Sequence, residues 1–149
     1  MRIFLATLLL CGTLFAKTYK VVYNLTTGSE AVLSKKLVAN TQKLKTYYEA
    51  KGDRLEVAVV VSGKAYRFFI QDLAHSPYAN ESALLKSQPA RTKMLDAFSK
   101  IATIEMCGMG MKHRKIAPET LYPFVKPAFN KTEALMRYQN SGYAYIPLR

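Results

Sequence analysis

The sequence predicts a single α/β domain in which a mainly parallel, five-stranded sheet lies between two layers of helices, a three-layer α/β/α architecture. Short apolar segments rich in β-branched and aromatic residues alternate along the chain with segments of helical periodicity. The strongest strand signal is the uninterrupted apolar run Leu55–Val61, which is typical of a central parallel strand buried on both faces. With 149 residues, half of them hydrophobic, the chain can bury one sizeable core.

The expected elements of the first half follow from apolar spacing and from turn residues: a strand over residues 19–25, a helix over 30–50, a strand over 55–61, a short helix over 65–73 and a loop over 75–88. Ser29 is a suitable N-cap for the long helix, and Gly52 ends it. The loop is expected because its residues show no clear period and include Ser-Pro and Asn.

The second half continues the alternation with a helix over residues 89–100, a strand over 101–107, a short helix over 109–115, a strand over 124–129, a helix over 130–138 and a strand over 143–148. Pro89 suits the first turn of its helix, where a missing N–H costs nothing. Pro127 weakens the fourth strand, and Asn130 or Thr132 caps the last helix, which ends near Gly142.

Residues 1–16 have the features of a signal peptide, which leaves residues 17–149 as the domain. Arg2 is followed by an apolar run of about a dozen residues, too short to span a bilayer comfortably, and Ala16 suits a cleavage site. Acylation of Cys11, as in a lipoprotein, is the alternative. We therefore expect a periplasmic or secreted protein.

The chain is strongly basic, with a formal net charge of +12 that falls to +11 when Arg2 is removed with the signal peptide. This excess is compatible with an ordinary solvated, lysine-rich surface. It also suits peripheral contact with an anionic membrane or binding of small oxyanions. Nucleic acid is not an expected partner, because an exported protein seldom meets it and the aromatic residues do not alternate with Lys or Arg.

Cys107 is the leading candidate for chemistry. It ends the third expected strand, where open α/β sheets place their functional groups, and it would be the sole thiol after removal of Cys11 with the signal peptide. A lone thiol in an oxidising compartment is a reactive group, an intermolecular pairing partner or an inert buried residue. A helix beginning at Gly108, with Lys112 nearby, would favour the thiolate.

Further candidate residues lie beside the thiol or at the carboxyl ends of neighbouring strands. His113 is a candidate acid–base neighbour of Cys107, although a partly exposed structural histidine is the simpler interpretation. The candidate ligand-binding residues share turn or helix-start positions that could hold a small anion: Asn24, Thr26, Thr27, Gly28, Ser62, Gly63, Gly108 and Arg114.

Metal and cofactor sites are not expected. The spacing of Cys107 and His113 matches no structural zinc pattern, and neither early turn carries a nucleotide-binding glycine motif. A soft-metal site of Cys107 with Met106, Met109 and Met111 is chemically conceivable, but packing explains these methionines more simply.

Four phrases in this order resemble the DsrE-like family of small α/β proteins: KVVYNLTTG from Lys20, LEVAVVVSG from Leu55, IEMCG from Ile104 and SGYAYIPL from Ser141. The resemblance covers roughly residues 18–148. It implies a five-stranded, mostly parallel sheet assembled as trimers or hexamers. It also implies that Cys107 accepts sulfur as a persulfide and passes it between donor and acceptor proteins.

These expectations lead to two hypotheses. The first is a sulfur-carrier or thiol-relay protein, a sulfurtransferase-like carrier at most, that uses Cys107 as its persulfide acceptor. The alternative is a non-catalytic module that binds a small anionic ligand or a partner in the cell envelope. The two differ in whether function survives replacement of Cys107 by Ser.

Overall fold

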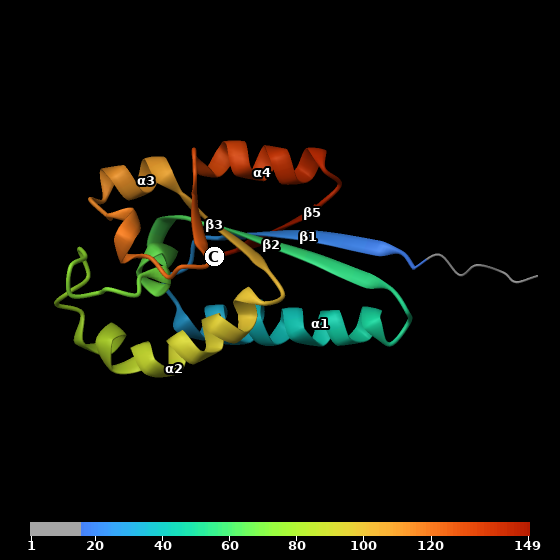
Figure 1. Ribbon diagram of the computed structural model, residues 1–149, viewed down its shortest axis with the longest axis horizontal. Helices are drawn as coiled ribbons and strands as arrows, with labels where there is room; N and C mark the ends of the chain where they lie inside the picture. Colours follow the sequence, from blue (N-terminus) through green and yellow to red (C-terminus); the bar gives the residue numbers. More distant parts are fainter. Residues whose placement is uncertain (1–15) are drawn as a thin grey trace, which may run out of the picture.

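The computed structural model describes residues 16–149 (Figure 1). The predicted signal peptide, residues 1–16, lies outside the described residues except for Ala16. Within the described part of the chain, no helix has the length and apolar character needed to cross a membrane.

The centre of the fold is a parallel sheet whose five strands lie in the order β4-β3-β2-β1-β5. The strands are β1 (Thr18–Leu25), β2 (Arg54–Val61), β3 (Thr103–Cys107), β4 (Val125–Ala128) and β5 (Ala144–Leu148). Each neighbouring pair runs parallel. The apolar run of β2 is the central strand, as its sequence predicts, and Pro127 lies in an edge strand, where a missing N–H is tolerated.

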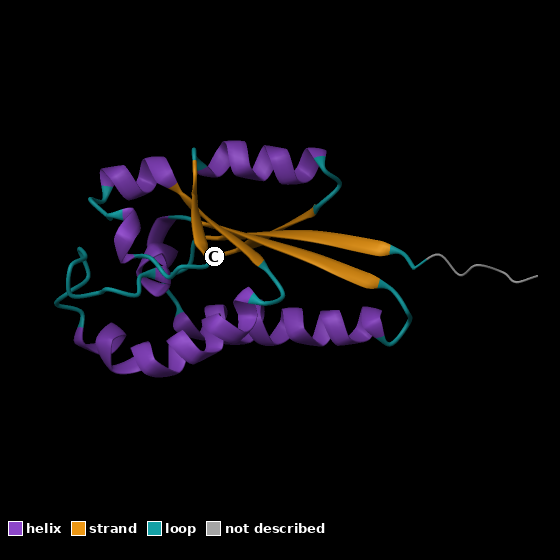
Figure 2. Ribbon diagram, viewed as in Figure 1, coloured by secondary structure: helices purple, strands orange, loops and turns teal. Residues whose placement is uncertain are grey.

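Helices cover both faces of this sheet, which confirms the three-layer α/β/α prediction (Figure 2). One face carries the π-helix η1 (Val32–Ala39), α1 (Asn40–Glu49) and α2 (Ser82–Ser99), whereas the other carries α3 (Gly108–His113) and α4 (Lys131–Asn140). Two short 3₁₀ segments, η2 (Gly63–Phe69) and η3 (Pro118–Thr120), follow β2 and α3.

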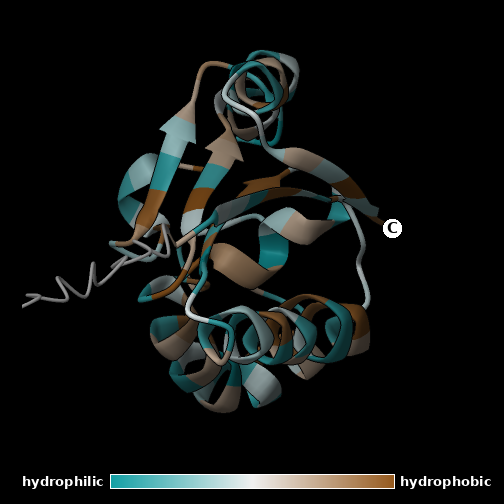
Figure 3. Ribbon diagram, turned by 90° about the vertical axis from the view of Figure 1, so that its right-hand side faces the viewer, coloured by the Kyte–Doolittle hydropathy of each residue, from teal (hydrophilic) through white to brown (hydrophobic). Residues whose placement is uncertain are grey.

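Two hydrophobic clusters, centred on opposite faces, hold these layers together, and Figure 3 shows hydrophobic segments in brown along the strands between the helix layers. Side chains alternate along β1, so that Val21 and Tyr23 join the larger cluster and Val22 joins the smaller one beneath α4. The larger cluster includes the wholly buried Leu33 and Leu37 of η1. Burial of this kind stabilises the fold by about 25 cal/mol for each Å² of apolar surface removed from water.

The long first helix is present, but its first half differs from the α-helix expected. Residues Val32–Ala39 form a π-helix, and the chain becomes α-helical from Asn40. Leu33 and Leu37, four residues apart, are both wholly buried, and the wider π turn keeps this spacing on one side of the helix. The Ser29 hydroxyl accepts from the N–H of Val32 at 3.3 Å, as expected of an N-cap.

The predicted start of the following helix is wrong. Helix α2 begins at Ser82 rather than at Pro89, so the second half of the expected loop is helical and Pro89 lies in the helix interior. A proline at this position leaves the carbonyl of Leu85 without its helical partner. Arg91 offsets this weakness, because its buried guanidinium donates to the Leu84 carbonyl at 3.0 Å and to the Ser87 hydroxyl at 2.7 Å.

Candidate functional site

The candidate site lies at the sheet edge where the carboxyl ends of the parallel strands meet. Cys107 is the last residue of β3 and also the N-cap of α3. Cys107 is 8% exposed, and its thiol is the free cysteine thiol within residues 16–149. Glu105, two positions earlier, contacts α4 through Arg137 and Tyr138, so alternation directs the Cys107 side chain toward the α4-bearing face. At this end of the strand Cys107 also packs against the larger core cluster.

Several donors around Cys107 favour its ionised form. Burial is the largest single influence and acts to raise the pKa of the thiol. The Tyr66 hydroxyl, the backbone N–H groups of Gly110 and Lys131 and the charge of Lys131 outweigh burial and place this pKa below its ordinary value. Gly110 belongs to α3 and Lys131 opens α4, so donors from two helices act on one sulfur.

Tyr66 is the buried neighbour of this site. It lies in η2, directly after β2, and is 2% exposed. Its hydroxyl donates to the backbone carbonyl of Cys107 at 3.0 Å. Burial, followed by the hydrogen bond to Cys107, raises the pKa of Tyr66, so the phenol remains a donor where the thiol ionises.

Two glycines allow this close packing. A Cβ on Gly108 would lie 2.5 Å from the carbonyl oxygen of Ala128, at the end of the neighbouring strand β4. A Cβ on Gly110 would overlap the Tyr66 hydroxyl and lie 2.8 Å from its ring carbon Cζ. Both glycines are therefore required by space around the Cys107 turn.

Ser62 lies beside Cys107 at the carboxyl edge of the sheet, whereas Gly63 lies against Thr26 at the end of β1. Val61 pairs with Met106, so Ser62 follows in register next to Cys107. Ser62 is extended, and alternation from Val60, which packs under α4, places its side chain on the α4 face. Its buried hydroxyl has no hydrogen-bond partner. A buried hydroxyl without a partner is costly and is suited to meeting a bound group.

The candidate residues at the end of β1 lie on the same edge but farther from the thiol. Strand β2 separates β1 from β3, so these residues are two strand spacings, about 10 Å, from Cys107. Thr26 donates its hydroxyl to the Leu148 carbonyl, and the Thr27 hydroxyl accepts from the N–H of Ser29. The Asn24 amide donates to the Tyr145 hydroxyl. These polar groups close the ends of β1 and β5. A Cβ on Gly28 would lie 3.2 Å from the Cβ of Lys64.

The candidate residues on and just after α3 do not contact the Cys107 sulfur. Lys112 and His113 are exposed in the last turn of α3, and neither is among the chief influences on the Cys107 thiol. Arg114 instead lies over the ring of Tyr66, with its guanidinium carbon 5.5 Å from the ring centroid. The cation that acts on the thiol is Lys131, from the start of α4.

No group of three or more His, Cys, Asp or Glu side chains within residues 16–149 is arranged to hold a metal ion. Beside Cys107, Met106 and Met111 are buried in the larger core cluster, whereas Met109 is 56% exposed. The Met109 sulfur accepts from the Asn130 amide at 3.7 Å. The buried methionines thus serve packing.

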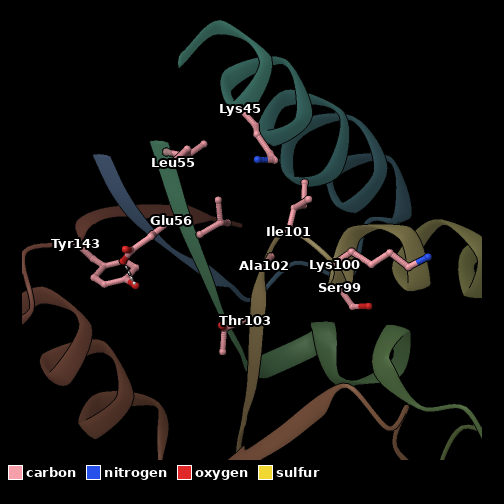
Figure 4. A pocket seen from close by; sticks show the side chains of 10 residues that line it. Lys45, Leu55, Glu56, Ser99, Lys100, Ile101, Ala102, Thr103 and Tyr143 are labelled. Carbon is pink, nitrogen blue, oxygen red and sulfur yellow. Dashed lines mark hydrogen bonds between the residues drawn. The ribbon is translucent and has the colours of Figure 1, made fainter. Parts of the chain in front are cut away.

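A polar pocket of about 460 Å³ lies at the opposite edge of the sheet, where β2 and β3 begin (Figure 4). Figure 4 shows Lys45, Lys100 and Tyr143 around its mouth, with the Tyr143 hydroxyl on the carboxylate of Glu56 at 3.0 Å. Its lysines already pair with acidic neighbours, Glu49 and Asp96. It is therefore remote from Cys107 and shows no cluster of free donors or acceptors.

Three residues of the site escape sequence reasoning: Tyr66, Gly110 and Lys131. A glycine inside the short helix after Cys107 is a local signal, since glycine weakens a helix and needs a packing reason. Tyr66 and Lys131 give no local signal, because they reach Cys107 from segments distant in the sequence.

Comparisons with known proteins agree with this architecture. Residues 20–148 match the model of the DsrE/DsrF-like family, which is nearly the whole described chain. The solved structure of a protein of unknown function from Methanobacterium thermoautotrophicum is similar at 16% sequence identity, with a TM-score of 0.60. That likeness covers 87% of this chain and 98% of the other, and it supports the fold. The curated proteins include no match. On the family match over residues 20–148, this chain belongs to the DsrE/DsrF-like family.

Proposed function

We propose that this protein carries sulfane sulfur on Cys107 as a persulfide and relays it from a donor to an acceptor. The observation that carries the proposal is the placement of a buried thiol among the Tyr66 hydroxyl and the N–H groups of Gly110 and Lys131, which lower its pKa. The thiolate is the nucleophilic form of cysteine. Membership of a family linked to sulfur relay supports the same chemistry.

The reaction balances without a redox partner. The Cys107 thiol releases its proton to solvent, and the thiolate attacks the outer sulfur of a persulfide or polysulfide donor. One S–S bond forms on Cys107 while the donor's S–S bond breaks, and the donor leaves as a thiolate. An acceptor thiolate then attacks the outer sulfur on Cys107, which restores the Cys107 thiolate.

Intact mass spectrometry tests this proposal. The purified protein is treated with glutathione persulfide, desalted and weighed, and Cys107→Ser is treated in parallel. We expect one added sulfur atom in the wild type, its loss on reduction with dithiothreitol, and no addition to the variant. An unmodified wild type, or equal modification of Cys107→Ser, would contradict the proposal.

Binding of a small anion without chemistry is the second candidate function, and the partnerless Ser62 hydroxyl beside Cys107 is the observation that favours it. Calorimetric titration with thiosulfate or sulfite separates the two. A binding module retains its affinity in Cys107→Ser and loses it in Ser62→Ala. A sulfur carrier shows sulfur transfer that requires Cys107.

The proposal extends to the setting of the reaction. We propose cleavage after Ala16, export to the periplasm or beyond, and assembly of the mature chain as a trimer or hexamer. We also propose sulfur-donor and sulfur-acceptor proteins as partners, with the basic surface allowing peripheral contact with anionic membranes. The mass of the protein recovered from the periplasm tests cleavage, and light scattering tests assembly. Sedimentation with phosphatidylglycerol vesicles tests the membrane contact.

A further inference from the structure

The contact between Tyr66 and the Cys107 turn joins two segments that are far apart in sequence. Tyr66 comes from η2 after β2, and Cys107 ends β3. The Tyr66 hydroxyl donates to the Cys107 carbonyl at 3.0 Å, and the residue is 2% exposed, so water competes little for this bond. The bond fixes the peptide group that links the thiol-bearing residue to α3.

Gly110 gives independent support for a specific role of this phenol. Its φ is not positive, so Gly110 does not use the conformational freedom particular to glycine. Glycine inside a helix costs about 1 kcal/mol relative to alanine. What Gly110 provides is space, because a Cβ there would overlap the Tyr66 hydroxyl. Gly110 therefore lowers the stability of α3 but leaves room for the Tyr66 hydroxyl.

Arg114 completes the surroundings of the ring. Its guanidinium carbon lies 5.5 Å from the Tyr66 ring centroid, at the end of the same short helix. Thus α3 contacts the phenol through a glycine at the hydroxyl and through a cation over the ring. These contacts leave the hydroxyl directed at Cys107.

We infer that Tyr66 is the positioning residue of the thiol site: its hydroxyl, bonded to the Cys107 carbonyl, holds the turn that joins the thiol to α3 and so fixes how the α3 backbone faces the sulfur. This inference rests on the proposed function of Cys107 and adds a regulator of its reactivity. The phenol acts through the backbone: its proton lies on the Cys107 carbonyl, and it takes no proton from the sulfur.

The test is the pH profile of Cys107 alkylation by iodoacetamide in the wild type and in Tyr66→Phe, which retains the ring and loses the hydroxyl. We expect the wild-type midpoint below that of a free thiol, near 8.5. In Tyr66→Phe we expect the midpoint to rise by about one pH unit. Alkylation then becomes roughly tenfold slower below the midpoint, with the same plateau at high pH.

Two further variants separate this role from loss of structure. Gly110→Ala displaces the phenol without removing its hydroxyl and is expected to raise the midpoint as Tyr66→Phe does. Tyr122→Phe is the matched control, because Tyr122 is also 2% exposed and its hydroxyl bonds Thr92 at 2.6 Å. Its midpoint should equal that of the wild type. Circular dichroism verifies folding of each variant.

Two results would overturn the inference in distinguishable ways. A lowered wild-type midpoint that Tyr66→Phe and Gly110→Ala leave unchanged would refute the role of Tyr66 and leave the sulfur-carrier proposal standing. A wild-type midpoint like that of a free thiol would refute both.

Discussion

The guanidinium of Arg91 is wholly buried and donates to the carboxylate of Glu30 at 3.0 Å, which ties α2 to the chain just before η1. Glu30 is the anionic partner of this cation, and its side chain is 38% exposed. Losing one member of such a pair is more harmful than losing a surface pair, because the remaining buried charge is uncompensated.

Replacing Glu30 by Ala should therefore lower the free energy of unfolding by about 2–3 kcal/mol, somewhat less than for a fully buried pair because Glu30 is partly exposed. Urea unfolding measures the effect. Glu49→Ala, which removes the exposed carboxylate that pairs with half-buried Lys45, is the control and should cost at most about 0.5 kcal/mol. Equal losses of stability in the two variants would show that the Arg91–Glu30 pair contributes no more than the Lys45–Glu49 pair.

The clamp between β3 and α4 gives a second stability prediction. Glu105 accepts from Arg137 at 2.6 Å and from the Tyr138 hydroxyl at 2.7 Å. Glu105→Ala should cost about 2–3 kcal/mol, because it leaves the hydroxyl of buried Tyr138 without a partner. Glu133→Ala is the control, since it removes an exposed partner of the same Arg137 and should cost about 0.5 kcal/mol or less. Thermal unfolding measures both variants, and equal losses of stability in Glu105→Ala and Glu133→Ala would contradict this prediction.

Lys115 offers a stabilising substitution. Its φ of 56° lies in the left-handed region, where it ends α3 with the N–H of Ile116 on the Met111 carbonyl at 2.9 Å. Glycine adopts this conformation without the strain of a side chain, so Lys115→Gly should raise the free energy of unfolding by about 0.5–1 kcal/mol. Lys112→Gly, inside the same helix, should lower it by about 1 kcal/mol. A loss of stability in both variants would contradict this account of the helix end.

The lowered pKa of Cys107 predicts a pH-dependent contribution to stability. The folded state binds the thiol proton less tightly than the unfolded state, so the contribution is lost as pH falls through the folded pKa and is fully present above the unfolded value, about 8.5. The stability of the wild type relative to Cys107→Ser should therefore increase from pH 6 to about 9. Denaturant unfolding at a series of pH values measures it.

Tyrosine titration sets the upper limit of that measurement. Burial raises the pKa of Tyr66 and of Tyr138, so their contributions to stability are present below the ordinary tyrosine value, about 10, and are lost above it. Keeping the pH below about 9 leaves both phenols largely protonated in either state. A stability difference between wild type and Cys107→Ser that stays constant over this range would contradict the lowered pKa.

Local patterns predicted most of the fold. Apolar runs such as Leu55–Val61 gave the strands and their parallel arrangement, because a strand buried on both faces needs a continuous apolar sequence. The sequence does not predict the helix start at Ser82, because Pro89 is typical of the first turn of a helix. In the structure the helical turn before Pro89 is stabilised by buried Arg91, which donates to the Leu84 carbonyl. The π-helix was missed because its sequence period is close to that of an α-helix.

For the site, the sequence by itself determined that Cys107 ends a strand and that Gly108 opens a helix, since strand and helix signals meet at this point of the chain. It also indicated that Ser62 would share that edge, because parallel strands align their carboxyl ends. The tertiary structure alone decided which groups surround the sulfur. Tyr66 and Lys131 reach Cys107 through strand order and helix packing, and such contacts depend on distance in space, which local sequence patterns do not encode.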